Sequence, residues 1–274
     1  MRVTLLGTGD TTGTPTIGCD CATCERARQE GIERSRFSVH VQNPRTDECL
    51  LIDMSPDFRH QFLTHEEPLP DAVIITHIHF DHLDGLGNAF RLFDELPVYG
   101  ANETDPVTGE SVAETIREKY YYLNRIDVRG VAPFTPVEIC GFEVEFVPVD
   151  HPPLVSYGLV ITDPDQGTRL VVTGDTSYAI SDDARAAFAE PDLLLADAIV
   201  PASVCEWHPA GGSDYSAEGV PFTFGNKHMT REGALTLAEE LDASETRLVH
   251  AAHYYPVDEA FCSPLAVDGE RIII

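Results

Sequence analysis

Lysine is almost missing from this 274-residue chain. Of its 18 basic residues only Lys119 and Lys227 are lysines, against 46 acidic residues, and the net charge is −28. Carboxylates that hold water keep a chain soluble at high salt, so this balance favours a protein from a high-salt cytoplasm over an ordinary acidic protein. At molar salt the Debye length is only about 3 Å, so the charge alone does not exclude nucleic acid as a partner.

Long apolar runs are lacking as well. No segment approaches the roughly 20 residues that a membrane helix needs. The N-terminal stretch MRVTLLGTGD reaches glycine too early for a signal peptide. We therefore expect a soluble, cytoplasmic protein without a membrane partner. Seven cysteines cannot all pair, and Cys19, Cys21 and Cys24 lie close together, which in a cytosolic chain indicates a metal before a disulfide.

The composition is that of a globular protein, with 43% hydrophobic and 23% charged residues. Each half of the chain has strands, then a strand that ends in a His- or Asp-rich turn, then a helix. This α/β pattern predicts two halves whose sheets pack face to face, in one domain over residues 1–274. A helix is predicted over Ser55–Thr64 with Ser55 as its N-cap, and residues 201–227 are predicted to be loop.

The strongest motif is His77-Ile78-His79-Phe80-Asp81-His82, directly after the apolar strand AVIIT. A turn at the carboxyl end of a strand can direct His77 and His79 at one ion, and Asp81 with His82 at a neighbouring ion. Neutral imidazole and carboxylate suit Zn²⁺, Mn²⁺ or Fe²⁺. The motif therefore predicts a site for two divalent metal ions.

This motif resembles that of the metallo-β-lactamase superfamily, and four further residues match the superfamily in order: Asp53 in LLID, His151 in VPVDHPP, Asp175 in VVTGDT and His250 in RLVH. The resemblance implies a four-layer αββα sandwich with two metals at one edge of the sheets. It implies that one metal is bound by His77, His79 and His151, the other by Asp81, His82 and His250, and that Asp175 bridges them together with a hydroxide. Asp53 is expected to orient a ligand imidazole.

His228 indicates a branch of the superfamily. The His-x-Thr of Asn226-Lys227-His228-Met229-Thr230 opens a helix and is similar to a motif of the phosphodiesterase branches. Cleavage of a phosphodiester expels an alkoxide, which a histidine near the metals can protonate. We therefore predict that His228 is catalytic, together with the metal ligand Asp81. The alternative for His228 is a helix-start histidine bonded to a backbone carbonyl.

The cysteine cluster suggests a second kind of metal site. Cys19, Cys21 and Cys24 would leave a tetrahedral ion one ligand short, and His253 follows His250 closely enough to supply the fourth. This set resembles the structural zinc site of the phosphoribosyl 1,2-cyclic phosphate phosphodiesterase family of the carbon–phosphorus lyase pathway. The resemblance implies a zinc-binding loop at about residues 13–25, and the charge balance adds the expectation of a haloarchaeal source.

The expected function is hydrolysis of a cyclic or small phosphodiester by in-line attack of a metal-bridging hydroxide. The alternative is a ribonuclease of the tRNA 3′-processing type, but Asp175 follows His151 by only 24 positions, which leaves no room for the basic arm with which members of that family clamp tRNA. RNA is thus the less favoured substrate. Zinc or manganese in the catalytic pair, a homodimer and the role of the 201–227 segment, where Trp207 could stack on a base or sugar, stay open.

Overall fold

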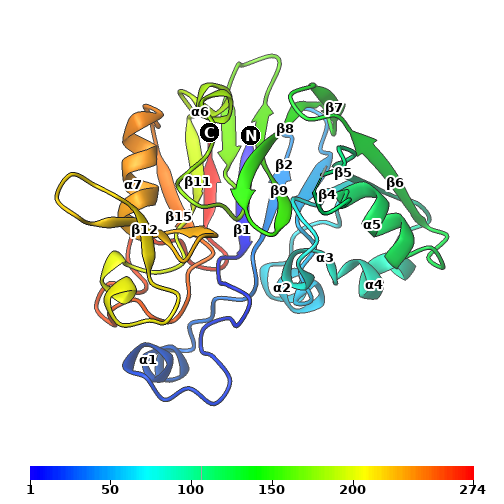
Figure 1. The fold of residues 1–274 in the computed structure, drawn as a ribbon. Helices are drawn as coiled ribbons and strands as arrows, with labels where there is room; N and C mark the ends of the chain where they lie inside the picture. Colours follow the sequence, from blue (N-terminus) through cyan, green and yellow to red (C-terminus); the bar gives the residue numbers. More distant parts are fainter. Residues whose placement is uncertain (106) are drawn as a thin grey trace.

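Two large sheets form the centre of the molecule. The computed structural model describes residues 1–105 and 107–274. Within them, seven strands form one sheet in the order β16-β1-β2-β3-β4-β5-β6, and six form a second in the order β15-β11-β10-β9-β8-β7. Apolar side chains of both sheets share one buried core, so the sheets pack face to face (Figure 1).

The first sheet consists of β1 (Arg2–Gly7), β2 (Ser38–Gln42), β3 (Cys49–Ile52), β4 (Ala72–Ile74), β5 (Leu96–Ala101), β6 (Ile126–Val131) and β16 (Arg271–Ile273). The second consists of β7 (Val137–Ile139), β8 (Phe142–His151), β9 (Leu154–Thr162), β10 (Arg169–Val172), β11 (Leu193–Asp197) and β15 (Thr246–Val249). Strands β3 to β6 run parallel, as do β10, β11 and β15, and the remaining neighbours are antiparallel.

Helices cover the outer faces of both sheets. On the first sheet, α2 (Phe58–His65) contacts β1, and α5 (Val112–Lys119) contacts β5 and β6. On the second, α6 (Asp182–Phe188) contacts β8, and α7 (Arg231–Glu240) contacts β11 and β15. Ser181 and Thr230 cap α6 and α7 through side-chain oxygens, as their residue types favour. The predicted αββα sandwich is confirmed.

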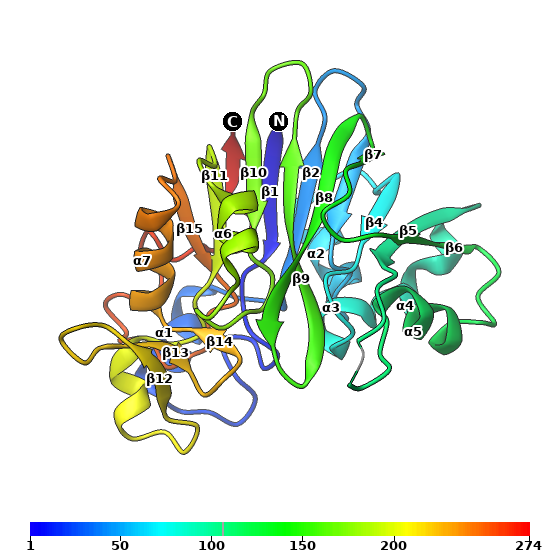
Figure 2. The same cartoon turned by 45° about the horizontal axis from the view of Figure 1, so that its top comes forward.

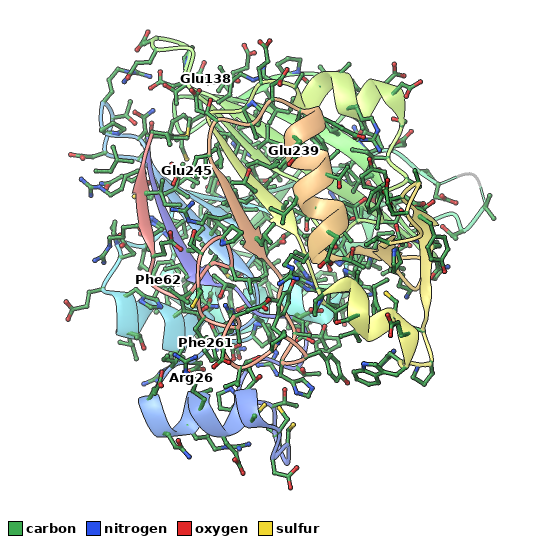
Figure 3. The ribbon with its side chains drawn as sticks, turned by 90° about the vertical axis from the view of Figure 1, so that its left-hand side faces the viewer. Arg26, Phe62, Glu138, Glu239, Glu245 and Phe261 are labelled. Atoms are coloured by element: carbon green, nitrogen blue, oxygen red, sulfur yellow. The ribbon has the colours of Figure 1, made fainter. Side chains whose placement is uncertain are left out.

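Short helices connect these layers at the end of the molecule that carries the motif residues. They are α3 (Phe80–Leu83), α4 (Leu86–Ala89) and η1 (Phe90–Leu92) after β4, and η2 (Ala202–Glu206) after β11. The N-terminal loop and α1 (Ala22–Glu30) lie below the strand ends, apart from the sandwich. Arg26 of α1 donates to the carbonyl of Val257 and stands 5.7 Å from the Phe261 ring, which ties α1 to the C-terminal segment (Figure 3).

Two expectations about local structure were wrong. Helix α2 begins at Phe58, because the Ser55 hydroxyl accepts from the Asp57 amide in a turn instead of capping the helix, and Asp57 forms an ion pair with Arg36 at 2.9 Å. The 201–227 segment is not all loop. It holds η2, β12 (Gly212–Tyr215) and β13 (Pro221–Phe224), and β13 pairs with β12 on one side and with β14 (His228–Met229) on the other (Figure 2). Glycines there, such as Gly219 at φ 83°, form hairpin turns.

In the part of the chain that the structure describes, none of the helices could span a lipid bilayer.

Candidate metal centre and structural metal site

Strand ends bring the motif residues together. His77 follows β4, Asp53 follows β3 and His250 follows β15, while Asp175 follows β10. Because parallel strands end at the same edge of a sheet, and the two sheets are stacked, these ends meet at one place. Asp53 and His250 both have positive φ, at 57° and 58°, so the chain turns sharply at each strand end and directs the side chain inward.

The first donor group consists of three imidazoles. The Nδ1 atom of His79 lies 2.9 Å from His77 Nε2 and 3.2 Å from His151 Nε2. Nitrogens bound to one tetrahedral zinc ion stand about 3.3 Å apart, given a Zn–N bond of about 2.05 Å. Burial lowers the pKa of each of these histidines, that of His151 to about 4, so the neutral form that binds metal predominates.

The second donor group consists of a carboxylate and two imidazoles. Asp81 Oδ2 lies 3.6 Å from His82 Nε2 and 3.7 Å from His250 Nε2. Both nitrogens and Asp81 Oδ1 are buried and, among the described residues, have no hydrogen-bond partner. Buried polar atoms without partners are rare in folded proteins, so this cluster fits a cation that would satisfy them.

Asp175 lies between the two groups. Its Oδ2 atom is 3.7 Å from His77 Nε2 and 3.3 Å from both His82 Nε2 and His250 Nε2. Burial works against the charged form of Asp175, but the neighbouring histidines hold its pKa well below the usual range. The geometry therefore places Asp175 where a bridging ligand would stand, with a single oxygen as the nearest atom to both groups.

A network behind the ligands fixes the orientation of two rings. His77 Nδ1 donates to Thr76 Oγ1 at 3.1 Å, and Thr76 donates to Asp53 Oδ2 at 2.8 Å. The same oxygen accepts from His82 Nδ1 at 2.6 Å. Burial would lower the pKa of His82, but Asp175 and Asp53 raise it well above its ordinary value. Asp53 thus holds His82, and through Thr76 also His77, so that each ring presents Nε2 to the centre.

His228 stands at the edge of the centre. Its ring stacks on His250 at 5.1 Å and meets His151 edge-on at 4.8 Å. Its Nδ1 donates to Asp197 Oδ2 at 2.9 Å. The partner is thus a carboxylate and not the backbone carbonyl that the alternative reading of a helix-start histidine expected. Its ligand atom also lies within 4.8 Å of those of Asp175 and His250, so the distances allow either a catalytic acid or a further ligand.

Sequence reasoning missed Asp197, which ends β11 and is buried. Its Oδ2 also accepts from the Thr176 amide at 3.0 Å, and its Oδ1 lies 3.7 Å from His250 Nδ1. Burial raises the pKa of Asp197 even though the nearby His228 lowers it. A signal was present, since LLLAD has the same pattern as the LLID that identified Asp53: an apolar strand that ends in aspartate. Thr11 was also missed, and its hydroxyl donates to Asp81 Oδ2.

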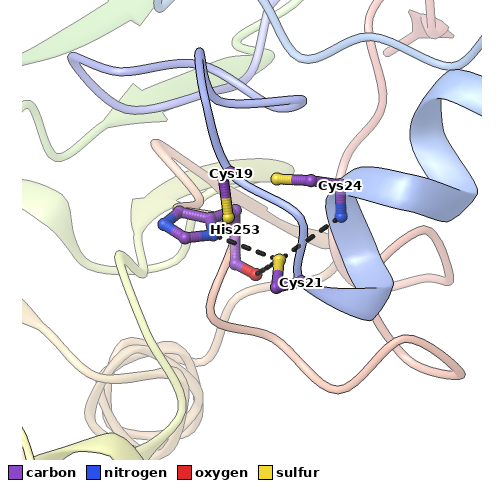
Figure 4. Close-up of side chains that lie close together, drawn as sticks. All are labelled: Cys19, Cys21, Cys24 and His253. Atoms are coloured by element: carbon purple, nitrogen blue, oxygen red, sulfur yellow. Dashed lines mark hydrogen bonds between the residues drawn. The ribbon is translucent and has the colours of Figure 1, made fainter.

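The cysteine cluster forms a separate site. Nδ1 of His253 lies 3.4 Å from the sulfur of Cys19 and 3.4 Å from that of Cys21, and Cys24 completes a group whose donor atoms lie within 4.8 Å of one another (Figure 4). Sulfur and nitrogen on one tetrahedral zinc stand about 3.5 Å apart. The amide of Cys21 lowers the pKa of Cys19, while burial raises that of Cys24 to about 11.

The loop expected at about 13–25 does not extend that far. Helix α1 begins at Ala22, and the Cys21 sulfur caps it by accepting from the Cys24 amide at 3.4 Å. Cys24 therefore sits in the first helical turn, which fixes two of the three thiols relative to each other.

Comparison with known proteins identifies the fold family. A model of the beta-lactamase superfamily domain matches residues 49–251. The crystal structure of a new diphosphatase from the PhnP family superposes with a TM-score of 0.76, at 26% identity, over 99% of this chain and 97% of that one. Human tRNase Z, short form, superposes with a TM-score of 0.67 over 100% and 99%, but at 19% identity shows the fold alone.

A curated relative matches over nearly the whole chain. It is the octanoyltransferase of Porphyromonas gingivalis, 29% identical over 270 residues. The match covers 94% of this chain but 47% of the relative, so the chain spans about half of that relative's length. About half of the relative lies outside the match.

Proposed function

Since the chain belongs to the beta-lactamase superfamily, we propose that it is a metal-dependent phosphodiesterase that hydrolyses a cyclic or small phosphodiester. One observation carries the proposal. Asp175 joins two donor groups, and beside them stands His228, whose Nδ1 is held by the buried Asp197. A centre built for two cations, with a proton donor at its edge, suits a reaction that expels an alkoxide.

The donor set decides which ions fit. Imidazole and carboxylate ligands accept either zinc or manganese, while the three thiols and one imidazole around Cys21 favour zinc. Two divalent cations bound between the donor groups would polarise the phosphate and activate a water molecule for in-line attack. The cysteine site has four protein donors, which is the closed arrangement of a structural zinc.

The protein's own residues have defined tasks in this proposal. Asp53 and Thr76 hold His77 and His82, and the Lys227 carbonyl accepts from His151 Nδ1 at 3.0 Å. Asp197 binds Nδ1 of His228, so Nε2 is the atom that gives a proton to the leaving oxygen. The same hydrogen bond fixes the orientation of the ring.

A monoester is disfavoured as substrate. A monoester dianion carries a further charged oxygen that needs positive groups around it. Lys227 is the only lysine in the 201–230 stretch, and the chain carries 46 acidic residues against 18 basic ones. A diester has one negative charge, which two cations and one histidine can neutralise.

Processing of tRNA is the competing function, because the fold is shared with tRNase Z. Between His151 and Asp175 the chain forms β9, a turn and β10, and no projecting arm. A long RNA would meet a surface with a net charge of −28. The hairpin and the charge both favour the small substrate.

A substrate panel tests the proposal. We would assay the zinc- and manganese-loaded protein at high salt with ribose 1,2-cyclic phosphate, 2′,3′-cyclic AMP, methyl p-nitrophenyl phosphate, a dinucleoside diphosphate, p-nitrophenyl phosphate and pre-tRNA. We expect the diesters to be cleaved far faster than the monoester. Efficient 3′ cleavage of pre-tRNA would instead support the nuclease, and a preference for the monoester would make the protein a phosphatase.

A further inference from the structure

Four aromatic side chains form a cluster beside the metal centre, here named the aromatic platform: Trp207, His208, Phe224 and Tyr254. The Trp207 ring lies 5.8 Å from His208 and 5.6 Å from Tyr254, and His208 lies 5.7 Å from Tyr254 and 4.9 Å from Phe224. Trp207 is 62% exposed and Tyr254 37% exposed. The platform is thus a packed group of rings with an open face.

One strand pair and one short segment connect the platform to the metal centre. Phe224 and His228 are directly opposed across the β13–β14 pair, so their side chains lie on the same face of that hairpin. On the other side, Tyr254 follows His250 by four residues, which places their Cα atoms at most about 14 Å apart. Tyr254 also packs on His253 at 4.3 Å, so the cysteine site holds one edge of the platform in place.

We propose that the aromatic platform stacks the base of a nucleotide substrate whose phosphodiester lies in the metal centre. The inference rests on the proposed function and narrows its substrate class. Exposure of the large apolar surface of a tryptophan to water is unfavourable. A planar ligand that stacks on the open face of the rings removes this surface from water. Stacking needs no charge, which suits a surface with few cations, and it accepts any base.

The arrangement favours a single nucleotide over a polymer. The phosphate would be held at the metal centre and the base at the platform, so both binding elements are used within one nucleotide. A longer strand would add phosphates over a surface where the charge balance is −28. A base-free diester would use the metal centre alone.

Matched substrates separate the platform from the chemistry. Adenosine 2′,3′-cyclic phosphate and glycerol 1,2-cyclic phosphate carry the same five-membered phosphodiester, but only the first has a base. We expect Trp207→Ala to raise the KM for the adenosine substrate relative to that for the glycerol substrate about tenfold, which corresponds to about 1.4 kcal/mol. The ratio of the two kcat values should change little. Trp207→Phe should largely restore the ratio, and Tyr121→Ala, at another exposed aromatic residue, should not change it.

Fluorescence provides a readout that does not need turnover, because Trp207 is the only tryptophan in the chain. With zinc-loaded protein excited at about 295 nm, 5′-AMP should quench the emission saturably and ribose 5-phosphate should not. Tyr254→Ala should raise the concentration of 5′-AMP at half-saturation several-fold. Melting curves of each variant would establish that it is folded.

The outcomes are distinct. An unchanged KM ratio in Trp207→Ala, or emission that ignores 5′-AMP, would overturn the inference while leaving the phosphodiesterase proposal intact. If neither cyclic phosphate is hydrolysed, the proposed function fails, and quenching by 5′-AMP alone still decides whether the platform binds a base. A third outcome would refute the base-binding role. If the emission without ligand depends on protein concentration, and a dimer of the wild type is lost in Trp207→Ala, then a second copy of the chain covers these rings.

Discussion

Replacing His228 with alanine should remove a proton donor without removing metal. The Nδ1 atom of His228 donates to the buried Asp197 at 2.9 Å, and the side chain is 14% exposed. Loss of a general acid costs a factor of about 10² to 10⁴ in kcat, or roughly 3 to 5 kcal/mol of transition-state free energy. Removal of the ring leaves the buried Asp197 carboxylate without this partner, so the variant should also lose about 1 to 3 kcal/mol of unfolding free energy, and melting curves should establish that it is folded.

The leaving group makes this test specific. An alkoxide needs a proton, whereas p-nitrophenolate does not, so His228→Ala should lose the full factor with a cyclic alkyl diester and less than about tenfold with methyl p-nitrophenyl phosphate. Asp197→Asn keeps the size and one acceptor oxygen but removes the charge, and should fall between wild type and His228→Ala. Equal losses with both leaving groups would refute the acid role, and loss of bound metal in His228→Ala would make His228 a ligand.

Three further expectations concern other parts of the molecule. Asp175→Ala should abolish turnover and lower the binding of both catalytic cations, because Oδ2 stands within 3.7 Å of both donor groups; loss of only one cation by elemental analysis would argue against a bridge. Cys21→Ser should lose about one zinc and destabilise the α1 region, and protein that keeps all its zinc would contradict the four-donor site. Burial raises the pKa of Asp268 to about 7, so the folded state retains a proton that the unfolded state releases above about pH 3.9. The unfolding free energy of wild type relative to Asp268→Asn should therefore fall by about 1.4 kcal/mol per pH unit between roughly pH 4 and 7, and then level off. Urea titrations that give parallel pH profiles for the two proteins would exclude this effect.

Local sequence was enough to predict the metal-binding candidates. His77 to His82 lie in one turn and indicate a metal site by themselves. The remaining candidates each follow an apolar strand, and the resemblance to the superfamily singled them out without knowledge of which strands pair. The cysteine group is equally local, apart from His253. The place of His253 could be inferred because this residue follows His250 closely.

Tertiary contacts decided what stands behind and beside these residues. Asp197 is paired with His228 across 31 positions, and Asp53 with His82 across 29, and no local pattern specifies such partners. The same holds for the aromatic platform, where Trp207 and Tyr254 belong to segments 47 residues apart. The sequence determined the donor chemistry, because ligand types and strand-end positions are local properties. Which carboxylate orients which imidazole, and which rings meet, was decided by sheet order and packing, which arise only when distant segments are brought together.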